Sequence, residues 1–407
     1  MLYWDPSDPA WSTNPGPLFD QLREEVPVHL TPDGAWVLAR HADCLSVLRD
    51  KSSSSDSLNT HADKRPRSFN GSGRQAEREL IEQTGVDNRP FLFRDPPDHT
   101  RLRGLVQRAF TPRRVNELAP FIANAAGRVI DAHLDGGTFD AVQELAWSVP
   151  VAVICELLDI PSSDHSSFQD QSARLARGLD PDFLLTDEDR ATRDGAILHF
   201  ISYFSDLYAQ RRAHPGDDLL SALVAARDGD DALSEGELLT TAILLLVAGH
   251  ETTMNLISGS LLALDRDHDA QRALRTSGVD RVAVDELLRM VSPVQLTART
   301  ILRDMTFDGH TIPEGSFVLL LVGAANRDPD VFEDPTRLHV TRDPNPQLGF
   351  GFGLHHCLGA PLARLEAQIV LQELFARTSS YEIVSPPHYR PNIVLRGLDR
   401  LDLVLHP

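Results

Sequence analysis

The sequence predicts a mainly α-helical protein with a minor β portion, organised as one domain over residues 1–407. Helical patterns continue with short breaks from Asp98 to about Leu264, whereas short strand patterns and turns occur near both ends of the chain. Helical patterns resume after each polar stretch, and neither a linker nor an internal repeat is visible. These observations favour one large unit over several smaller ones.

The first elements are a hairpin and a short helix. Val26–Leu30 and Ala35–Arg40 are rich in apolar residues and are separated by Thr31-Pro32-Asp33-Gly34, and Asp-Gly is a favoured hairpin turn. A helix is predicted from His41 to Arg49. Residues 51–90, which follow, are polar. They form either a mobile surface segment or a long loop that covers a site.

One long helix is predicted in the middle of the chain. Ser234 and Glu237 have the spacing of a capping box, and the stretch from Leu238 to about Leu264 is nearly all apolar. Such a helix should run through the centre of the protein. Its apolar pattern is interrupted by residues 248–253, Ala-Gly-His-Glu-Thr-Thr, where a Thr hydroxyl can bond to the carbonyl one turn earlier and bend the helix. This turn is either a pocket with proton donors or a simple kink.

The C-terminal third mixes helices with short strands. Phe317–Val322 has a strand pattern, and Gly and Pro mark turns at residues 312–315 and 327–329.

Composition and charge exclude several classes of protein. The formal net charge of −20 argues against nucleic acid as the main partner, because phosphate binding needs a basic face. The N-terminus has no signal-peptide pattern, and the longest apolar run, Ala242–Gly249, is far shorter than the ~20 residues of a membrane span. We therefore expect a cytoplasmic protein that does not enter membranes. Three cysteines fit a reducing compartment, with Cys44 and Cys155 predicted to lie in the core.

The strongest local signal surrounds the third cysteine, Cys357. Residues 350–359 read Phe-Gly-Phe-Gly-Leu-His-His-Cys-Leu-Gly, and an amphipathic helix is predicted to follow. Glycines allow the backbone to approach a flat ligand closely. A cysteine at a helix N-terminus faces free N–H groups, which favour a negative sulfur. Such a thiolate is a suitable axial ligand for heme iron. The alternative is a buried free cysteine in a Gly-rich loop.

This segment resembles the heme-binding signature of the cytochrome P-450 monooxygenases, Phe-x-x-Gly-x-His-x-Cys-x-Gly, and the resemblance extends over essentially the whole chain. It implies the cytochrome P-450 fold, with heme b between the long central helix and the helix of the cysteine loop. It further implies that Cys357 is the iron ligand. The residues around it that would contact the cofactor are Phe350, Gly351, His355 and Gly359.

The same resemblance assigns roles within the interrupted turn of the long helix. Thr252 becomes the alcohol that hydrogen-bonds the activated oxygen, and Glu251 the acid that relays protons to it. Ala248 becomes a heme contact. His250 should point elsewhere on the helix, so we do not expect it to bind iron.

Further motifs match the family in the same order. Glu286 and Arg289, at i and i+3, correspond to a buried pair that locks the region behind the heme, although alone they would fit a solvated helix face. His99 and Arg103 lie at i and i+4 on a predicted helix, so they point the same way. By resemblance these two, together with Arg299 and His355, bind the heme propionates. The alternative for each is an ordinary surface cation.

Candidate substrate contacts also follow from matching positions in the family. They are mostly apolar, so the part of the substrate near iron should be apolar or aromatic. They comprise Phe91, Leu92 and Phe93; Leu244, Val247 and Ala248; Gln295, Leu296 and Thr297; and Ile393 and Val394. Residues 51–90 and 174–193 would form an entrance rich in both signs of charge, which suits a large, polar or tethered molecule. The expected substrate is a secondary-metabolite intermediate, alternatively an acyl or aryl group on a carrier protein.

The predicted function is heme-thiolate oxygen activation and oxygen insertion, as hydroxylation or epoxidation, by a monomeric enzyme. Electrons would come from a ferredoxin and its reductase, because the chain has no flavin or iron–sulfur segment. A basic patch would receive the ferredoxin. Its members are Arg101, Arg108, Arg113, Arg114 and Arg364. The rivals are a non-catalytic heme sensor and a peroxide-driven peroxygenase, neither of which needs the Glu251–Thr252 pair.

Overall fold

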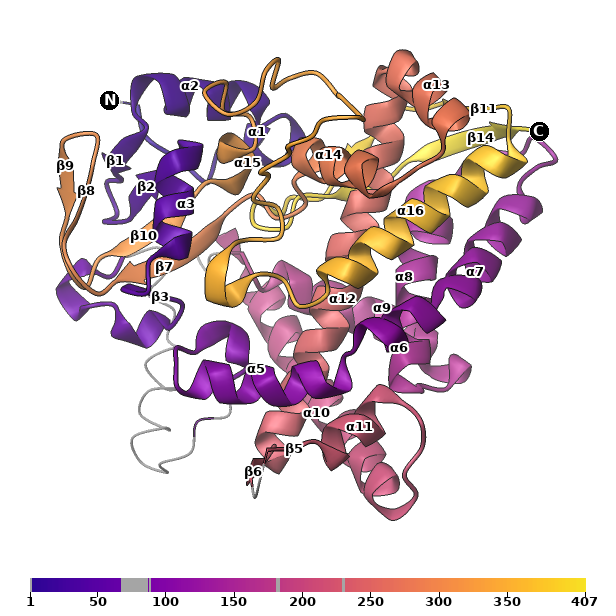
Figure 1. Ribbon diagram of the computed structural model, residues 1–407, viewed down its shortest axis with the longest axis horizontal. Coiled ribbons are helices and arrows are strands. Elements are labelled where there is room, and N and C mark those ends of the chain that lie inside the picture. Colours follow the sequence, from indigo (N-terminus) through magenta and orange to yellow (C-terminus); the bar gives the residue numbers. More distant parts are fainter. Residues whose placement is uncertain (1, 67–86, 88, 181–183, 229–230) are drawn as a thin grey trace.

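In the computed structural model, α12 (Glu235–Arg266) runs through the middle of the molecule, and the other elements surround it (Figure 1). The structure describes residues 2–66, 87, 89–180, 184–228 and 231–407. Helix α16 (Ala360–Arg377) crosses in front of α12 in this view and packs against it. The strands nearest the N-terminus lie on one side of α12, and α7 (Ala119–Ala132) and α8 (Ser148–Leu158) lie on the other.

Helices make up most of the described chain. The remaining long helices are α2 (Gly16–Glu25), α3 (His41–Arg49), α5 (Asp98–Ala109), α9 (His165–Arg177), α10 (Asp187–Ala213), α13 (His268–Ser277) and α14 (Arg281–Val291). Shorter ones are α1 (Ala10–Thr13), α6 (Pro112–Glu117), α11 (Leu219–Ala225) and α15 (Val322–Ala325). The 3₁₀ turns are η1 (Ser57–Asn59), η2 (Ala62–Lys64), η4 (Phe91–Phe93), η6 (Ser162–Asp164) and η8 (Gly353–His355), and η5 (Val142–Trp147) is a π-helical turn.

The largest sheet joins both ends of the chain. Its order is β1 (Val28–Leu30), β2 (Trp36–Leu38), β10 (Phe317–Leu320), β7 (Thr297–Ile301) and β3 (Ser53–Ser54). The β2–β10 pair is parallel and the others are antiparallel, with Val318 opposite Arg299. A second sheet has the order β11 (Ser380–Ile383), β14 (Asp402–His406) and β4 (Phe139–Asp140). Two-stranded ribbons are formed by β5 (Arg227–Asp228) with β6 (Asp231–Ala232), β8 (Met305–Phe307) with β9 (His310–Ile312), and β12 (His388–Tyr389) with β13 (Leu398–Arg400).

The long central helix forms as the sequence predicts. The Ser234 side chain accepts a hydrogen bond from the Glu237 amide, and the Glu237 carboxylate accepts one from the Ser234 amide, which completes the capping box. The helix continues through Gly249, where an added Cβ would lie 3.1 Å from Ile154 Cδ1, so glycine allows α8 to pack closely. The predicted back-bond is present, from Thr252 Oγ1 to the Ala248 carbonyl at 2.9 Å.

Most of the other sequence predictions about the fold are confirmed. The hairpin is β1–β2, and α3 has the predicted bounds. The strand predicted for Phe317–Val322 ends at Leu320, because α15 begins at Val322. Cys44 and Cys155 are buried in hydrophobic clusters. Much of the polar segment 51–90 lies outside the described residues, namely 67–86 and 88. Across the described part of the chain, no helix has both the length and the apolar character of a membrane span.

Glu286 and Arg289 of α14 form a fully buried ion pair, as predicted, and this pair is the centre of a larger network. Two guanidinium nitrogens donate to the carboxylate at 2.7 and 2.8 Å. Arg289 also donates to the carbonyls of Asn326 and Pro335, and Glu286 accepts from the His339 amide. The pair thereby ties α14 to the irregular segment that leads to the cysteine loop.

Glu286→Gln should strongly destabilise the protein, because it leaves the Arg289 charge buried without its counter-charge. We expect the free energy of unfolding to fall by about 3–5 kcal/mol, measured by urea denaturation. Arg272→Gln, which breaks an exposed pair with Asp269 on α13, is the control and should leave the midpoint unchanged. Equal midpoints for the two variants would contradict the role given to the buried pair.

Candidate active site

The cysteine loop is shaped by glycines at positions where other residues would not fit. Gly351 and Gly353 have φ values of +68° and +72°, and a Cβ on Gly353 would lie 2.6 Å from the Leu48 carbonyl oxygen. The Cys357 amide donates to the Phe350 carbonyl at 2.9 Å and closes the loop just before α16. Cys357 is exposed, unlike the other two cysteines.

The amides at the start of α16 favour a negative sulfur, as the sequence predicts, although the surrounding protein atoms act against them. Although Cys357 is accessible to solvent, the protein atoms packed around its sulfur desolvate it and raise the pKa of the thiol, whereas the Gly359 and Ala360 amides and Arg103 act in the opposite direction. A metal cation bound to the sulfur would add to the stabilisation of a thiolate, because coordination deprotonates a thiol outright.

One stripe of α12 is accessible although the helix lies in the middle of the molecule. Ala248 is exposed, and Leu244, Val247 and Thr252 are partly exposed, whereas Leu246 and His250 are buried. Residues spaced three and four apart share a helix face. The stripe therefore combines small and apolar side chains with one hydroxyl. This combination suits a flat cofactor and a substrate.

The neighbouring acid, Glu251, points elsewhere. It is 1% exposed and forms an ion pair with Arg390, next to β12. Its other oxygen lies 3.8 Å from His250 Nε2, and His250 Nδ1 is 2.7 Å from the Leu246 carbonyl oxygen. The sequence prediction grouped Glu251 with Thr252, but the two side chains make separate contacts.

The four predicted propionate partners converge. The ring centroids of His99 and His355 are 4.1 Å apart. Burial lowers the pKa of His355 to about 3, and the nearby charges of His99, Arg299 and Arg103 act in the same direction. Burial likewise lowers the pKa of Arg299 to about 10. In the part of the chain that the structure describes, none of the four has a carboxylate hydrogen-bonded to it or ion-paired with it, and both ring nitrogens of His99 lack a partner.

A buried cluster of cations and imidazoles without bonded counter-charges fits a ligand that brings carboxylates. Heme carries two propionates, so these residues fit the group that the cysteine loop predicts. Arg103 also donates to the His356 carbonyl at 2.7 Å, which links α5 to the cysteine loop.

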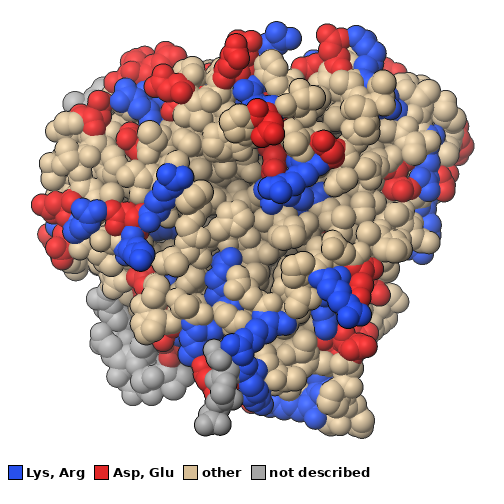
Figure 2. Space-filling model, in the orientation of Figure 1, with Lys and Arg blue, Asp and Glu red and all other residues tan. Residues whose placement is uncertain are grey.

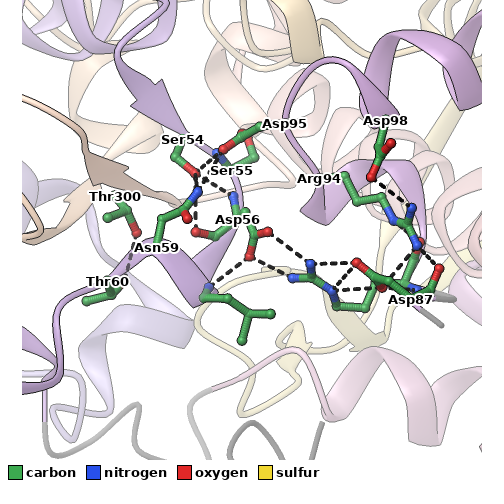
Figure 3. Close-up of polar contacts among 12 residues, drawn as sticks. Ser54, Ser55, Asp56, Asn59, Thr60, Asp87, Arg94, Asp95, Asp98 and Thr300 are labelled. Atoms are coloured by element: carbon green, nitrogen blue, oxygen red, sulfur yellow. Dashed lines mark hydrogen bonds and ion pairs between the residues drawn. The ribbon is translucent and has the colours of Figure 1, made fainter. Parts of the chain in front are cut away.

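A polar network anchors the loop that carries Phe91, Leu92 and Phe93 (Figure 3). Asp95 accepts hydrogen bonds from Ser54 Oγ, the Ser55 amide and Asn59 Nδ2. Arg89 bridges Asp56 and Asp87, and Arg94 pairs with Asp87 at 3.0 Å and with Asp98 at 3.6 Å. Thr60 bonds to Thr300, the neighbour of Arg299. The network fixes η4 relative to β3 and β7.

The remaining substrate candidates fall into two groups. Gln295–Thr297 and Ile393–Val394 lie together, since the Gln295 amide donates to the Val394 carbonyl at 2.9 Å. Buried Asp180 accepts from the amides of Ile393 and Val394 and holds that segment in place. Phe91 is buried with its ring 6.2 Å from His99, while Leu92 and Phe93 are exposed.

Sequence reasoning missed Asp180 and Arg390. Neither belongs to a motif, and their partners lie 213 and 139 residues away in the chain. No local pattern could have indicated either pairing.

Known proteins share this architecture. A model of the Cytochrome P450 family matches residues 180–379. The polyketide biosynthesis cytochrome P450 PksS of Bacillus subtilis (strain 168) is 36% identical over 416 residues, 99% of each chain, and its solved structure gives a TM-score of 0.87 over 100% of both chains. The vitamin D(3) 25-hydroxylase of Pseudonocardia autotrophica is 38% identical, covering 97% of this chain and 94% of that one. P450BioI, solved in complex with an acyl carrier protein ligated to hexadec-9Z-enoic acid, gives a TM-score of 0.85 at 32% identity, covering 97% of this chain and 100% of that one.

The accessible cysteine, the stripe on α12 and the cationic cluster define a heme-thiolate enzyme. The chain belongs to the cytochrome P450 family and is a heme-dependent monooxygenase that resembles bacterial members.

Replacing Cys357 by Ser should abolish thiolate ligation. The reduced wild-type protein with CO should show the red-shifted Soret band of a cysteine-ligated heme, because the thiolate donates electron density to iron. Cys44→Ala and Cys155→Ala, at the two core cysteines, are the matched controls and should keep this band. Persistence of the band in Cys357→Ser would refute the assignment.

Proposed function

We propose that the protein inserts one oxygen atom of O₂ into an apolar or aromatic part of a secondary-metabolite intermediate, with heme b as cofactor and a ferredoxin as electron donor. The accessible stripe of Leu244, Val247, Ala248 and Thr252 on α12 carries this proposal, because it offers apolar contacts for a substrate beside the Thr252 hydroxyl. When bound, heme supplies the binding and activation of O₂.

In this proposal the residues of the chain have separate tasks. Cys357 holds iron, and the cluster of His99, Arg103, Arg299 and His355 binds the two propionates. Phe350, Gly351, Ala248 and Gly359 contact the porphyrin. Thr252 holds a proton at its hydroxyl, and Glu251 delivers protons from solvent to that side of α12. These two side chains favour an oxygen-activating enzyme over a heme sensor, which has no need of protons.

Two features support the substrate class. The candidate contacts are apolar except for Gln295 and Thr297; the apolar ones include Phe91, Leu92, Leu244, Val247, Leu296, Ile393 and Val394. Among the relatives, PksS is named for polyketide biosynthesis. The solved complex of P450BioI with an acylated carrier protein supports the second candidate, a carrier-bound acyl or aryl substrate.

A spin-state titration of the heme protein tests the substrate class. We expect the Soret shift of a displaced water ligand with polyketide-like macrocycles, or with acyl chains on a carrier protein, at micromolar concentrations. Free small terpenes are the comparison. A shift with small terpenes alone would contradict both candidates.

A basic region supports the proposed ferredoxin. Lys and Arg side chains gather around α5 and α6 on the face shown in Figure 2. Several predicted members are compensated by acids: Arg101 pairs with Asp231 and Glu237, Arg113 with Glu117, and Arg364 with Asp285. Arg114 donates to the carbonyl of Asp217, and Arg108 donates to that of Arg227. The positive field is therefore weaker than the sequence implied, and Arg114 becomes a better site to test than Arg364.

Charge reversal at Arg113 and Arg114 should slow reduction by an acidic ferredoxin by about tenfold at low ionic strength, since electrostatic attraction accelerates association. The effect should shrink as salt is added, and the substrate-induced spin shift should stay unchanged. Stopped-flow reduction is the measurement. Arg272→Glu, at an exposed arginine of α13, is the control. If the wild type, the Arg113 and Arg114 variant and Arg272→Glu are reduced at equal rates, α6 is not part of the docking face.

A further inference from the structure

A cavity lies where the N-terminal part of the chain, the second half of α12 and the C-terminal part of the chain meet. Its volume is about 360 Å³, which is within the range of small-molecule sites. Its walls come from α2, α12, α14, α15 and the segment from β12 to β13. It shares Gln295 with the candidate substrate contacts, but its walls include none of the residues that would contact heme. The cavity is therefore separate from the heme site.

Two buried side-chain amides at the wall of this cavity have unused hydrogen-bonding atoms. Asn255 of α12 is 1% exposed, and neither its Oδ1 nor its Nδ2 has a partner among the described residues. The Gln295 side chain is also buried; its Nε2 donates to the Ser292 carbonyl, but its Oε1 has no such partner. Buried polar atoms without partners are unfavourable in a folded protein. A molecule that fills the cavity could supply the missing hydrogen bonds.

The cavity is also positively charged. Among the described residues, four arginines and one acid line it, namely Arg266, Arg327, Arg337, Arg396 and Asp267. Arg327 is already paired with an acid, Asp20, at 2.8 Å. Arg396 instead donates to the carbonyls of Ser12 and Thr13, and burial lowers its pKa. In the part of the chain that the structure describes, no carboxylate pairs with Arg396, and an anion in the cavity would meet this unbalanced charge.

A glycine brings one of these cations close to an unpaired amide. A Cβ on Gly397 would lie 1.8 Å from Asn255 Oδ1, so glycine allows this segment to pack directly against the amide. Arg396, the preceding residue, lines the same cavity, with its guanidinium over the Tyr389 ring. Much of the remaining wall is apolar and includes Phe19, Leu262, Ala263, Met290, Val291 and Leu338. The cavity thus combines a cation, an amide and an apolar surface.

Gln295 connects the cavity with the candidate substrate contacts. It directly precedes Leu296 and Thr297 in the chain. Its backbone amide donates to the Val394 carbonyl, and its carbonyl accepts from the Gly323 amide, each at 2.9 Å. A ligand that bonds to the Gln295 side chain would therefore act on a residue that holds both groups of candidate substrate contacts together.

We propose that this cavity is a second ligand site, for a small organic acid that carries both a carboxylate and an amide, and that its occupation is transmitted through Gln295 to the substrate contacts. The planar guanidinium of Arg396 matches a carboxylate, and Asn255 offers both a donor and an acceptor to an amide. The apolar walls select an organic acid over an inorganic anion. Binding is independent of the proposed function, whereas the transmission rests on the substrate role proposed for residues 295–297.

The first test uses N-benzoylglycine, which combines a carboxylate, an amide and an apolar ring. Isothermal titration calorimetry of the heme-loaded protein should show one site with a submillimolar Kd. Asn255→Ala and Arg396→Gln should each weaken binding at least about tenfold, because each removes a hydrogen-bonding partner in a desolvated site. Ala263→Phe, which fills the cavity and leaves its charges in place, should abolish binding. Arg272→Gln, on the exposed surface of α13, is the control and should bind as the wild type does.

Two related compounds test the class of ligand. The methyl ester of N-benzoylglycine lacks the charge, and 4-phenylbutyrate lacks the amide, so each should bind at least about tenfold more weakly than the acid. The CO band of each variant shows that the protein is folded around heme. Absence of binding by N-benzoylglycine, or wild-type binding in Ala263→Phe, overturns the site. Equal binding of the ester and the acid overturns the assignment of an anionic ligand.

The second test measures the transmission to the substrate contacts. The probe of the active site is 4-phenylimidazole, whose ring nitrogen binds heme iron and shifts the Soret band. Saturating N-benzoylglycine should change its Kd at least about threefold and then have no further effect, because coupling between two separate sites is finite. Gln295→Met should remove this change. A Kd that rises without limit as N-benzoylglycine is added shows competition within the active site and overturns the second site. An unchanged Kd, or the wild-type change in Gln295→Met, overturns the transmission.

These failures are distinguishable from failure of the proposed function. A protein with the thiolate CO band that oxidises no secondary-metabolite intermediate would contradict the proposed function, and the calorimetric result would still decide the second site. An active monooxygenase that does not bind N-benzoylglycine overturns only the inference about the cavity.

Discussion

The buried Glu286–Arg289 ion pair is the constraint on which the active site depends. Two opposite charges without solvent contact are tolerated only when every lone pair and donor has a partner. Here those partners are backbone groups of otherwise irregular chain together with the side chains of Arg342 and Asn345. Arg289 holds the Asn326 carbonyl, and the Asn326 side chain accepts from the Leu348 amide at 2.8 Å. The next residues form the cysteine loop. The sulfur is therefore positioned through a chain of hydrogen bonds that begins on α14.

The cationic cluster and the network in Figure 3 differ in how their charges are compensated. Around Asp56, Asp87 and Asp95 the acids have arginines or several donors as partners, so this network stabilises the loop without a ligand. Around His355 and Arg299 burial lowers the pKa values, because the charged forms have no anion bonded to them. A ligand that brings carboxylates would reverse these shifts. The network of acids is therefore preorganised without a cofactor, whereas the cationic cluster is completed by one.

The features that could be predicted from the sequence are those that depend on residues close together in the chain. Capping by Ser234 and Glu237, the i and i+4 spacing of His99 and Arg103, and the glycines before Cys357 all act over a few residues, and each has its predicted structural outcome. Contacts between distant segments could not be predicted in this way. The pairing of Arg390 with Glu251 depends on how β12 and β13 meet α12, and Asp180 is coupled to Ile393 by tertiary packing alone. The opposing effect of the protein atoms around the Cys357 sulfur could not be predicted either, because those atoms come together only in the folded chain.

Helix geometry explains why Glu251 and Thr252 make separate contacts. Consecutive residues of an α-helix point about 100° apart, so Glu251 and Thr252 cannot both face the accessible stripe beside Ala248. If the acid shared that stripe, it would place a charge against the cofactor and away from Arg390. On the adjacent face it lines a cavity of about 350 Å³ and pairs with Arg390, while the Thr252 hydroxyl stays on the stripe. In the relay that we propose, Glu251 takes up protons on one side of the helix and Thr252 uses them on the other, and the flexible glutamate side chain is the part that can span the two.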